Sequence, residues 1–283
     1  MNNYFILAPR EMSDARIKQL LKKYLPRGKV TFGIAKEKYI AGFENQPQFK
    51  TLSSALLSRL ASQSAGRLEL FEYAQCDGVK IIEQLDFTHA IVINGSFHRS
   101  FHLRPEFAAI NSKPAKLKYE SPFTDEAEAI RYAKNHNSPR PLPEFSENSI
   151  QQILAQESTR AFITDFQTAA AIVKDNQIIA LTHNPVVPYE TYAWHFGLSR
   201  EKHQTPAGDS SQYDTVHAET AALLQAGLQA KGATIYMRTF PCPHCARNIV
   251  HAGISEVVYQ LDYGDRYGYD LFEKANINYR RLP

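Results

Sequence analysis

The sequence has few cysteines and no long apolar run, and both absences narrow the class of protein. Its 283 residues include only three cysteines, Cys76, Cys242 and Cys245, which is too few for a disulfide framework and fits a reducing compartment. No apolar run approaches the roughly 20 residues that a membrane span needs. Met1–Tyr4 also lacks the basic start and apolar stretch of a secretory signal. We therefore expect a cytoplasmic protein with no membrane partner.

Charge is unevenly divided along the chain, although the net charge is only +3. Residues 1–145 carry 21 Lys and Arg against 15 Asp and Glu, whereas residues 146–283 carry 11 against 14. A basic half can attract a nucleotide or RNA, but a nucleic-acid footprint usually has a pI above about 9 with clustered charge. An ordinary solvated surface is therefore the favoured interpretation. The first half has no Gly-x-x-x-x-Gly-Lys, which removes a kinase interpretation.

The first half alternates apolar strands with amphipathic helices. Strands are predicted at residues 4–8, 30–34, 68–73 and 89–93, and helices at 13–24, 52–60, 79–85 and 124–133. This alternation predicts a parallel sheet in a separate α/β (Rossmann-like) domain over residues 1–137. Its role is open, with nucleotide or anion binding and regulation as candidates.

A proline-rich stretch separates this domain from the rest of the chain. Three prolines fall within positions 139 to 143, which excludes a helix or a central strand and predicts a stiff linker over residues 138–146. In the remainder, residues 147–283, helices are predicted at 150–161, 217–226 and 242–252, and strands at 168–173, 178–181 and 234–238.

The most informative motif is His217-Ala218-Glu219, followed by the run Pro241-Cys242-Pro243-His244-Cys245, whose first cysteine lies 23 residues after Glu219. His217, Cys242 and Cys245 are three ligands suited to zinc, and three protein ligands leave a fourth position open, as catalytic zinc sites do. Both ligand groups fall at predicted helix N-termini, which favours thiolates. Glu219 is placed to move protons beside such a site.

This signature resembles that of the zinc-dependent cytidine and deoxycytidylate deaminase superfamily. The similarity continues in Ala246 and Ile249, in Gly253-Ile254 and in Val257-Val258-Tyr259, and it covers roughly the last half of the chain. The resemblance implies a three-layer α/β/α domain over residues 147–283, a Zn²⁺ cofactor and hydrolytic deamination of a cytosine nucleoside or nucleotide. It also implies a homo-oligomer.

The resemblance assigns roles to further residues. Glu219 is the implied catalytic proton carrier, Asn184 the implied sugar contact, and Ala218 and Phe240 the implied substrate neighbours. Two positions depart from the deoxycytidylate pattern, because Ala221 replaces an asparagine and Phe240 replaces a small or acidic residue. Both departures put the standard deoxycytidylate specificity in doubt.

Other interpretations of the same residues stay open. A base in RNA or DNA is an alternative substrate, and a non-catalytic zinc-stabilised binding module is an alternative function. A structural zinc site would need a fourth ligand, for which His244 is the nearest candidate. His98 and His102 have the spacing of ligands on one helix face, although ordinary roles are favoured there. Cys76 is expected to be a small buried side chain.

Between Asn184 and His217 lies a long insertion, residues 185–216, which is rich in aromatic residues near its start. A segment of this length is usually functional or disordered. Its aromatic side chains, which include the only tryptophan, Trp194, argue against full disorder. We expect the insertion to close over the site as a lid, with Trp194 stacked on the base. A subunit contact is the alternative.

Overall fold

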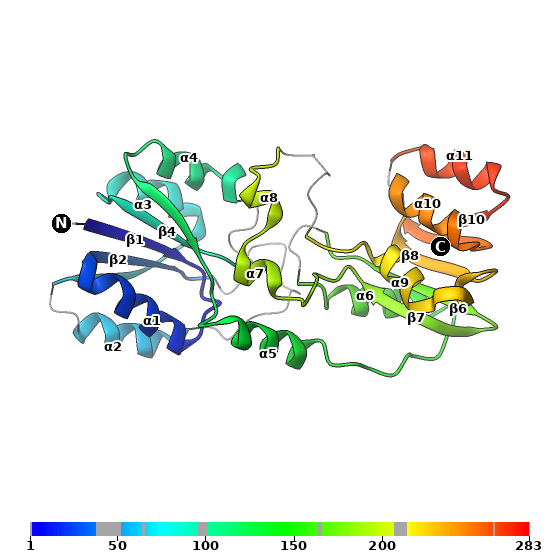
Figure 1. Ribbon diagram of the computed structural model, residues 1–283, viewed down its shortest axis with the longest axis horizontal. Coiled ribbons are helices and arrows are strands. Elements are labelled where there is room, and N and C mark those ends of the chain that lie inside the picture. Colours follow the sequence, from blue (N-terminus) through cyan, green and yellow to red (C-terminus); the bar gives the residue numbers. More distant parts are fainter. Residues whose placement is uncertain are drawn as a thin grey trace. The chain divides into compact units, whose positions relative to one another are not determined.

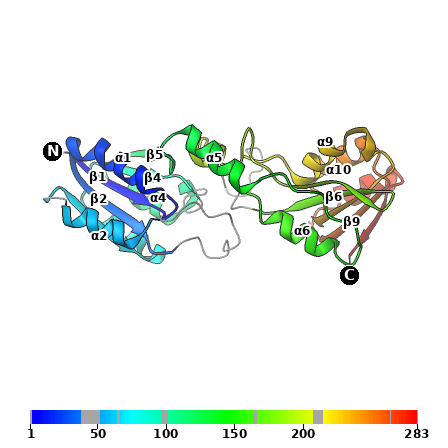
Figure 2. The ribbon, with the colours of Figure 1, turned by 90° about the horizontal axis from the view of Figure 1, so that it is seen from below.

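The computed structural model describes residues 2–37, 52–63, 66–95, 101–162, 166–206, 214–262 and 264–282, without the side chains of residues 54, 61 and 63. The chain divides into two compact units (Figures 1 and 2). The N-terminal unit comprises residues 1–135 and 191–214, and the C-terminal unit comprises residues 136–190 and 215–283. Among the described residues, no helix is long and apolar enough to cross a membrane.

The N-terminal unit is built on a five-stranded parallel sheet in the order β3-β2-β1-β4-β5. The strands are β1 (Asn2–Ala8), β2 (Gly28–Ala35), β3 (Leu68–Tyr73), β4 (His89–Ile93) and β5 (Lys116–Glu120). The parallel α/β sheet predicted from the alternating pattern is thus confirmed. β5 was not among the predicted strands, because its sequence alternates apolar residues with lysines and reads as an ordinary exposed segment.

Helices cover both faces of this sheet, namely α1 (Asp14–Tyr24), α2 (Ser54–Gln63), α3 (Gly78–Gln84) and α4 (Pro105–Asn111). A further helix, α5 (Glu126–His136), follows β5 in the chain. β1 shows why both faces need a cover. Tyr4 and Ile6 pack with the apolar residues of α1 and α2. Phe5 and Leu7 point the other way and pack with α3 and α4. In Figure 1 these two helix pairs lie on opposite sides of the strands.

The C-terminal unit contains a mixed five-stranded sheet in the order β10-β9-β8-β6-β7. Its strands are β6 (Ala169–Lys174), β7 (Gln177–His183), β8 (Thr234–Thr239), β9 (Glu256–Leu261) and β10 (Asn278–Arg281). β6 pairs antiparallel with both β7 and β8, whereas β8, β9 and β10 run parallel.

Three layers form because both faces of this sheet are apolar. α6 (Ile150–Ser158) covers one face, with Ile150 and Leu154 packed on β6. The other face is covered by α9 (Ala218–Ala226), α10 (Pro243–Ala252) and α11 (Tyr267–Lys274). Figure 2 shows α6 across the sheet from α9 and α10. The α/β/α architecture expected for this half of the chain is confirmed.

The insertion differs from its expected placement within the C-terminal domain. Residues 191–214 group with the N-terminal unit, and their described part contains the short helices α7 (Tyr192–Phe196) and α8 (Ser199–Lys202). Thr191 donates to the carbonyl of Ala129, and the Ser121 hydroxyl lies 2.8 Å from His195 Nδ1. Residues 191–214 therefore belong to the N-terminal unit, although the chain before and after them belongs to the C-terminal unit.

Glu201 is the main polar anchor of this inserted helix. Its carboxylate accepts hydrogen bonds from the His102 backbone N–H at 2.9 Å and from the Tyr119 hydroxyl, and it contacts His102 Nδ1 at 2.8 Å. The other ring nitrogen of His102 contacts the Thr205 carbonyl at 2.8 Å. His102 is therefore engaged within the fold, while its proposed metal partner His98 lies outside the described residues.

One smaller prediction was wrong. Cys76 is exposed, in the short 3₁₀ turn Gln75–Asp77, rather than buried. The turn follows the carboxyl end of β3, where the chain leaves the sheet and no element covers it among those described.

Replacing Glu201 with Ala should destabilise the N-terminal unit. The substitution leaves buried donors on His102 and Tyr119 without an acceptor, which costs about 1–3 kcal/mol for each group, with incomplete additivity. We expect the free energy of unfolding to fall by about 2–5 kcal/mol in denaturant titrations followed by circular dichroism.

Glu83→Ala, at an exposed position on α3, is the matched control and should change stability by less than about 0.5 kcal/mol. Equal effects of the two substitutions would contradict the anchoring role of Glu201.

Candidate metal centre and active site

The N-termini of two helices hold the three predicted metal ligands. His217 is the N-cap residue of α9, and Cys242 is the N-cap residue of α10, with Pro243 at its first position. Cys245 follows one turn later and is 1% exposed. The partial positive charge at a helix N-terminus stabilises a thiolate. The N-terminal ends of α9 and α10 therefore both favour negative charge at the place where the three ligands meet.

The ligand atoms have the spacing that zinc requires. His217 Nδ1 lies 3.5 Å from Cys242 Sγ and 3.3 Å from Cys245 Sγ, and all three atoms lie within 4.8 Å of one another. With Zn–N of about 2.0 Å and Zn–S of about 2.3 Å, tetrahedral geometry separates nitrogen and sulfur by about 3.5 Å. The donor set thus fits zinc, and it leaves a fourth position for another ligand.

The two thiols differ in pKa, because Cys242 loses its proton more easily than Cys245 does. A hydrogen bond from Cys245 lowers the pKa of Cys242 to about 3, and the same hydrogen bond together with burial raises the pKa of the Cys245 thiol. The hydrogen bond with Cys242 also raises the pKa of His217. One thiolate is thus present at neutral pH, and binding a metal would release the second proton.

Glu219 is buried beside the cluster, with its Oε2 3.5 Å from Cys245 Sγ. Burial raises the pKa of Glu219 above the ordinary range of a glutamate. A carboxyl group with a raised pKa can both accept and return a proton near neutral pH. The geometry therefore brings together all four residues that the motif predicted.

His244 does not join this cluster. It is exposed, and its Nδ1 lies 3.3 Å from an Arg247 guanidinium nitrogen. Among the described residues, the group of potential metal ligands contains His217, Cys242 and Cys245 without His244. The structure thus gives no support to His244 as the fourth ligand of a closed, structural zinc site.

Thr220 is a supporting residue that the sequence analysis missed. Its hydroxyl accepts a hydrogen bond from Asn248 Nδ2 at 3.1 Å and lies 3.7 Å from Cys245 Sγ. Because the Asn248 amide nitrogen can only donate, the Thr220 hydroxyl keeps its own hydrogen available for the sulfur. A threonine directly after Glu219 carries no signal of this role in one sequence, because the contact needs α10 beside α9.

Asn184, the predicted sugar contact, is buried at the end of β7. Its Oδ1 accepts from the Thr168 backbone N–H at 3.0 Å, and its Nδ2 donates to the Phe166 carbonyl at 2.8 Å. The side chain therefore ties the start of the β6 region to the end of β7. Ala218, the predicted substrate neighbour on α9, is fully buried, and its carbonyl accepts from the Thr182 hydroxyl at 2.8 Å.

Phe240 lies in an aromatic cluster rather than on an open surface. Its ring stacks on Tyr269 with centroids 3.8 Å apart and is 1% exposed. Tyr259 and Phe272 contact the same ring edge-on. Since Phe240 is two residues before Cys242, this packing fixes the loop that delivers the ligand. A role in packing therefore accounts for the ring, and its contact with substrate stays a prediction.

Trp194 is 4% exposed, on α7 in the N-terminal unit. The predicted stacking of its ring on a base stays a prediction.

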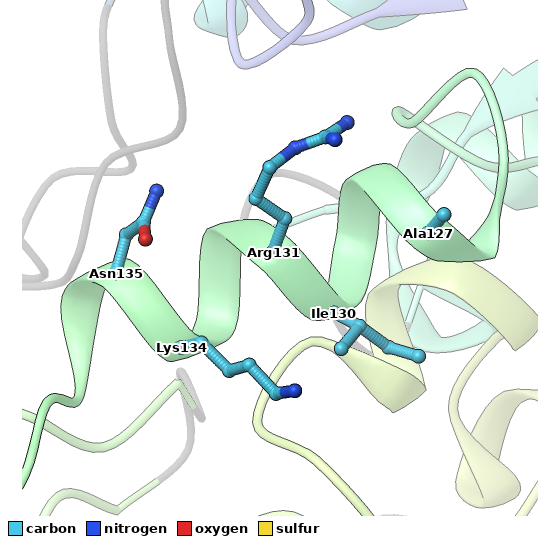
Figure 3. Close-up of a pocket in the computed structure, with 5 residues that line it drawn as sticks. All are labelled: Ala127, Ile130, Arg131, Lys134 and Asn135. Atoms are coloured by element: carbon cyan, nitrogen blue, oxygen red, sulfur yellow. The ribbon is translucent and has the colours of Figure 1, made fainter.

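A hollow of about 290 Å³ on α5 is a second candidate for a binding site. It is lined by Ala127, Ile130, Arg131, Lys134 and Asn135, which all come from one helix. Figure 3 shows that these side chains point in different directions rather than toward one another. None of the predicted site residues lines it, and its charged groups do not converge on a ligand position.

Comparison with known proteins places the matched region around the metal cluster. Residues 145–261 match the family described as the cytidine and deoxycytidylate deaminase zinc-binding region. A deaminase of uncharacterised role, encoded in the luxG 3′ region of Aliivibrio fischeri, is 30% identical over 126 residues, which are 41% of this chain and 80% of that protein.

Other known proteins are matched over different shares of their own length. The deoxycytidylate deaminase of Saccharomyces cerevisiae is 34% identical over 122 residues, which span 41% of this chain and only 38% of the yeast protein. The structure of the dCMP deaminase of cyanophage S-TIM5 with dCMP and dUMP is 18% identical, with a TM-score of 0.37, and the alignment covers 48% of this chain and 96% of the phage protein.

The three ligands predict metal stoichiometry. Purified protein should contain about one zinc per chain, and the paired substitution Cys242→Ser with Cys245→Ser should remove it, because hydroxyls replace both thiolates. Elemental analysis by mass spectrometry measures both. Cys76→Ser, at the exposed cysteine, is the matched control and should leave the zinc content unchanged. Zinc retained at full stoichiometry in the paired variant would contradict the assignment.

Proposed function

The chain belongs to the cytidine and deoxycytidylate deaminase family, and on that premise we propose that its C-terminal unit hydrolyses the exocyclic amine of a cytosine nucleotide. The products are the uracil nucleotide and ammonia. The observation that carries this proposal is the convergence of His217, Cys242 and Cys245 within 4.8 Å, with the buried carboxyl of Glu219 3.5 Å from Cys245 Sγ. A site that only stabilised the fold would not need that carboxyl.

His217, Cys242 and Cys245 would hold the zinc, with two thiolates and one neutral imidazole as ligands. When bound, zinc supplies the Lewis acidity that makes water a nucleophile at neutral pH. Two thiolates cancel the formal charge of the ion, so the proton of the attacking water still needs an acceptor.

Glu219 is that acceptor in the proposed reaction. It takes the proton from water as oxygen bonds to C4 of the cytosine ring, and it passes the proton to the ring nitrogen N3. It then takes the second proton from the hydroxyl group now on C4 and carries it to the amine, so that the C4 carbonyl forms as the C4–N bond breaks and ammonia leaves. One carboxyl group serves each transfer in turn, which requires that it is not itself a metal ligand. Its burial and raised pKa suit this alternation.

A nucleotide is the favoured substrate because relatives from yeast and phages carry the name deoxycytidylate deaminase. Ala221 and Phe240 depart from the deoxycytidylate pattern. Phe240 is packed against Tyr269, so its departure from the pattern changes at least the residue that anchors the ligand loop. We also propose that the described contacts of Asn184 hold it in place for the sugar.

Glu219→Gln tests the assignment of the proton carrier. The amide keeps the size of the side chain but cannot exchange protons, so turnover of dCMP should fall by about 10²–10⁴-fold or more, with zinc content unchanged. Ammonia release and elemental analysis give the two readouts. Glu273→Gln, at an exposed position on α11, is the matched control. Loss of zinc from Glu219→Gln would show that Glu219 is a ligand and contradict the mechanism.

Asn184→Ala tests the proposed sugar contact. The change removes one hydrogen bond to each of two backbone groups as well as the substrate contact, so kcat/KM should fall by at least tenfold while zinc content is retained. Steady-state kinetics on dCMP measure the effect, and Asn278→Ala at an exposed position on β10 is the control. An unchanged kcat/KM would remove Asn184 from the site.

A further inference from the structure

The insertion leaves and re-enters the C-terminal unit through a short two-stranded neck. Val186 and Thr215 form an isolated antiparallel bridge, and the Val216 N–H donates to the Pro185 carbonyl at 2.9 Å. The residues on either side of this neck belong to the site, because Asn184 precedes Pro185 and His217 follows Val216. Whatever holds the neck therefore holds the predicted sugar contact and a metal ligand together.

A buried histidine next to the neck is clamped between two carboxylates. His183 is 8% exposed, and its Nδ1 lies 2.8 Å from Glu157 Oε1 on α6 while its Nε2 lies 2.9 Å from Glu190 Oε1. A carboxylate is an acceptor only, so both ring nitrogens must donate, and that is the imidazolium form. The clamp is thus a cation between two anions.

Glu190 connects this cation to the neck. Its second oxygen, Oε2, accepts the backbone N–H of Val186 at 3.1 Å. A continuous path of hydrogen bonds therefore runs from His183 through Glu190 to Val186, and across the neck from Pro185 to Val216. The next residue along the chain is the ligand His217. All of these contacts lie within the C-terminal unit.

The charges around His183 nearly balance. Glu157 also pairs with Arg160 at 3.1 Å, so α6 contributes one anion and one cation to the cluster, and the neck loop contributes the anion of Glu190. His136, at the end of α5, has its pKa lowered by burial and by the cations Arg160 and Arg140, and it is therefore neutral at pH 7. Arg238 on β8 donates to the Ser158 hydroxyl at 2.9 Å, next to Glu157 on α6.

We propose that His183 is a positioning residue for the deaminase site, which holds the neck through Glu190 and so fixes Asn184 and His217 in register. This proposal rests on the proposed function. Loss of the His183 proton would leave one carboxylate without its donor, and the neck would then depend on its own two backbone contacts. Neither Glu157 nor His183 lies in a recognisable motif, and the family signature assigns no role at these positions.

The contacts of His183 with Glu157 and Glu190 make the site sensitive to alkaline pH. The direction of the change in stability with pH follows from the pKa of His183. Burial alone would lower that pKa, but the hydrogen bonds to Glu157 and Glu190 outweigh it and raise the pKa above the ordinary value of 6.5. A raised folded-state pKa gives stability that is fully present below pH 6.5 and is lost as pH rises through the raised value. Positioning of the neck should be lost over the same interval.

The test compares the zinc-loaded protein with His183→Gln and Glu190→Gln between pH 6 and pH 10. Thermal melting gives the stability, chelator competition gives zinc retention, and steady-state kinetics on dCMP give kcat and kcat/KM. The amide introduced by His183→Gln could donate to one carboxylate only, so we expect kcat/KM to fall about tenfold to a hundredfold at pH 6.5. The exposed His251→Gln on α10 is the matched control and should follow the wild type.

The pH profiles separate positioning from simple packing. The melting temperature of the wild type should approach that of His183→Gln as pH rises, because only the wild type has a proton to lose. Glu190→Gln removes one anion, so its alkaline fall in melting temperature and in kcat/KM should move to lower pH. This second variant keeps the test decisive if His183→Gln does not fold.

Two outcomes would overturn the proposal. One is a melting difference between wild type and His183→Gln that is the same at every pH. The other is an alkaline limb of kcat/KM that is identical in wild type and Glu190→Gln. The melting curves need no substrate, so a protein that deaminates no cytosine compound would contradict the proposed function while its clamp could still be measured.

Discussion

Two helix N-termini, α9 and α10, must hold one imidazole and two thiols within a few ångströms of each other, and the C-terminal unit is organised around that requirement. β8 runs into the loop that carries Cys242, and the ring of Phe240 locks this loop into a cluster with Tyr269. Gly268 on α11 permits the approach, because a Cβ there would lie 2.6 Å from the Phe240 ring. The neck performs the same task for His217 from the other side. Aromatic packing thus positions Cys242, and hydrogen bonds of the neck position His217.

The sequence predicts those features of the protein that depend on residues close together in the chain. The strands and helices of the first half follow from apolar spacing, and the three ligands with Glu219 follow from a motif in which each residue type has a chemical reason. Such features depend on residues that are near in sequence, and their structure agrees with the expectation. β5 was missed because Leu117 and Tyr119 are its only apolar residues, which is too weak a signal when the segment is read alone.

The parts that could not be predicted depend on contacts between residues far apart in the chain. Glu201 meets His102 and Tyr119 across about a hundred residues, and nothing in the local sequence around Ser199–Lys202 indicates that it packs in the N-terminal unit. The pairing of Glu157 with His183 is another example. Phe240 shows the converse case, because a residue placed near substrate by resemblance carries out a packing role that its aromatic neighbours, 19 to 39 residues later, determine.

The central claim is that the C-terminal unit removes the amine of a cytosine nucleotide. Incubation of the zinc-loaded protein with cytidine, dCMP, adenosine compounds and single-stranded oligonucleotides, followed by mass spectrometry, tests it most directly. The account predicts a gain of about one dalton in a free cytosine nucleotide, with one equivalent of ammonia released. Zinc-loaded protein that leaves every free cytosine compound unchanged, or that converts only bases within oligonucleotides, would contradict it.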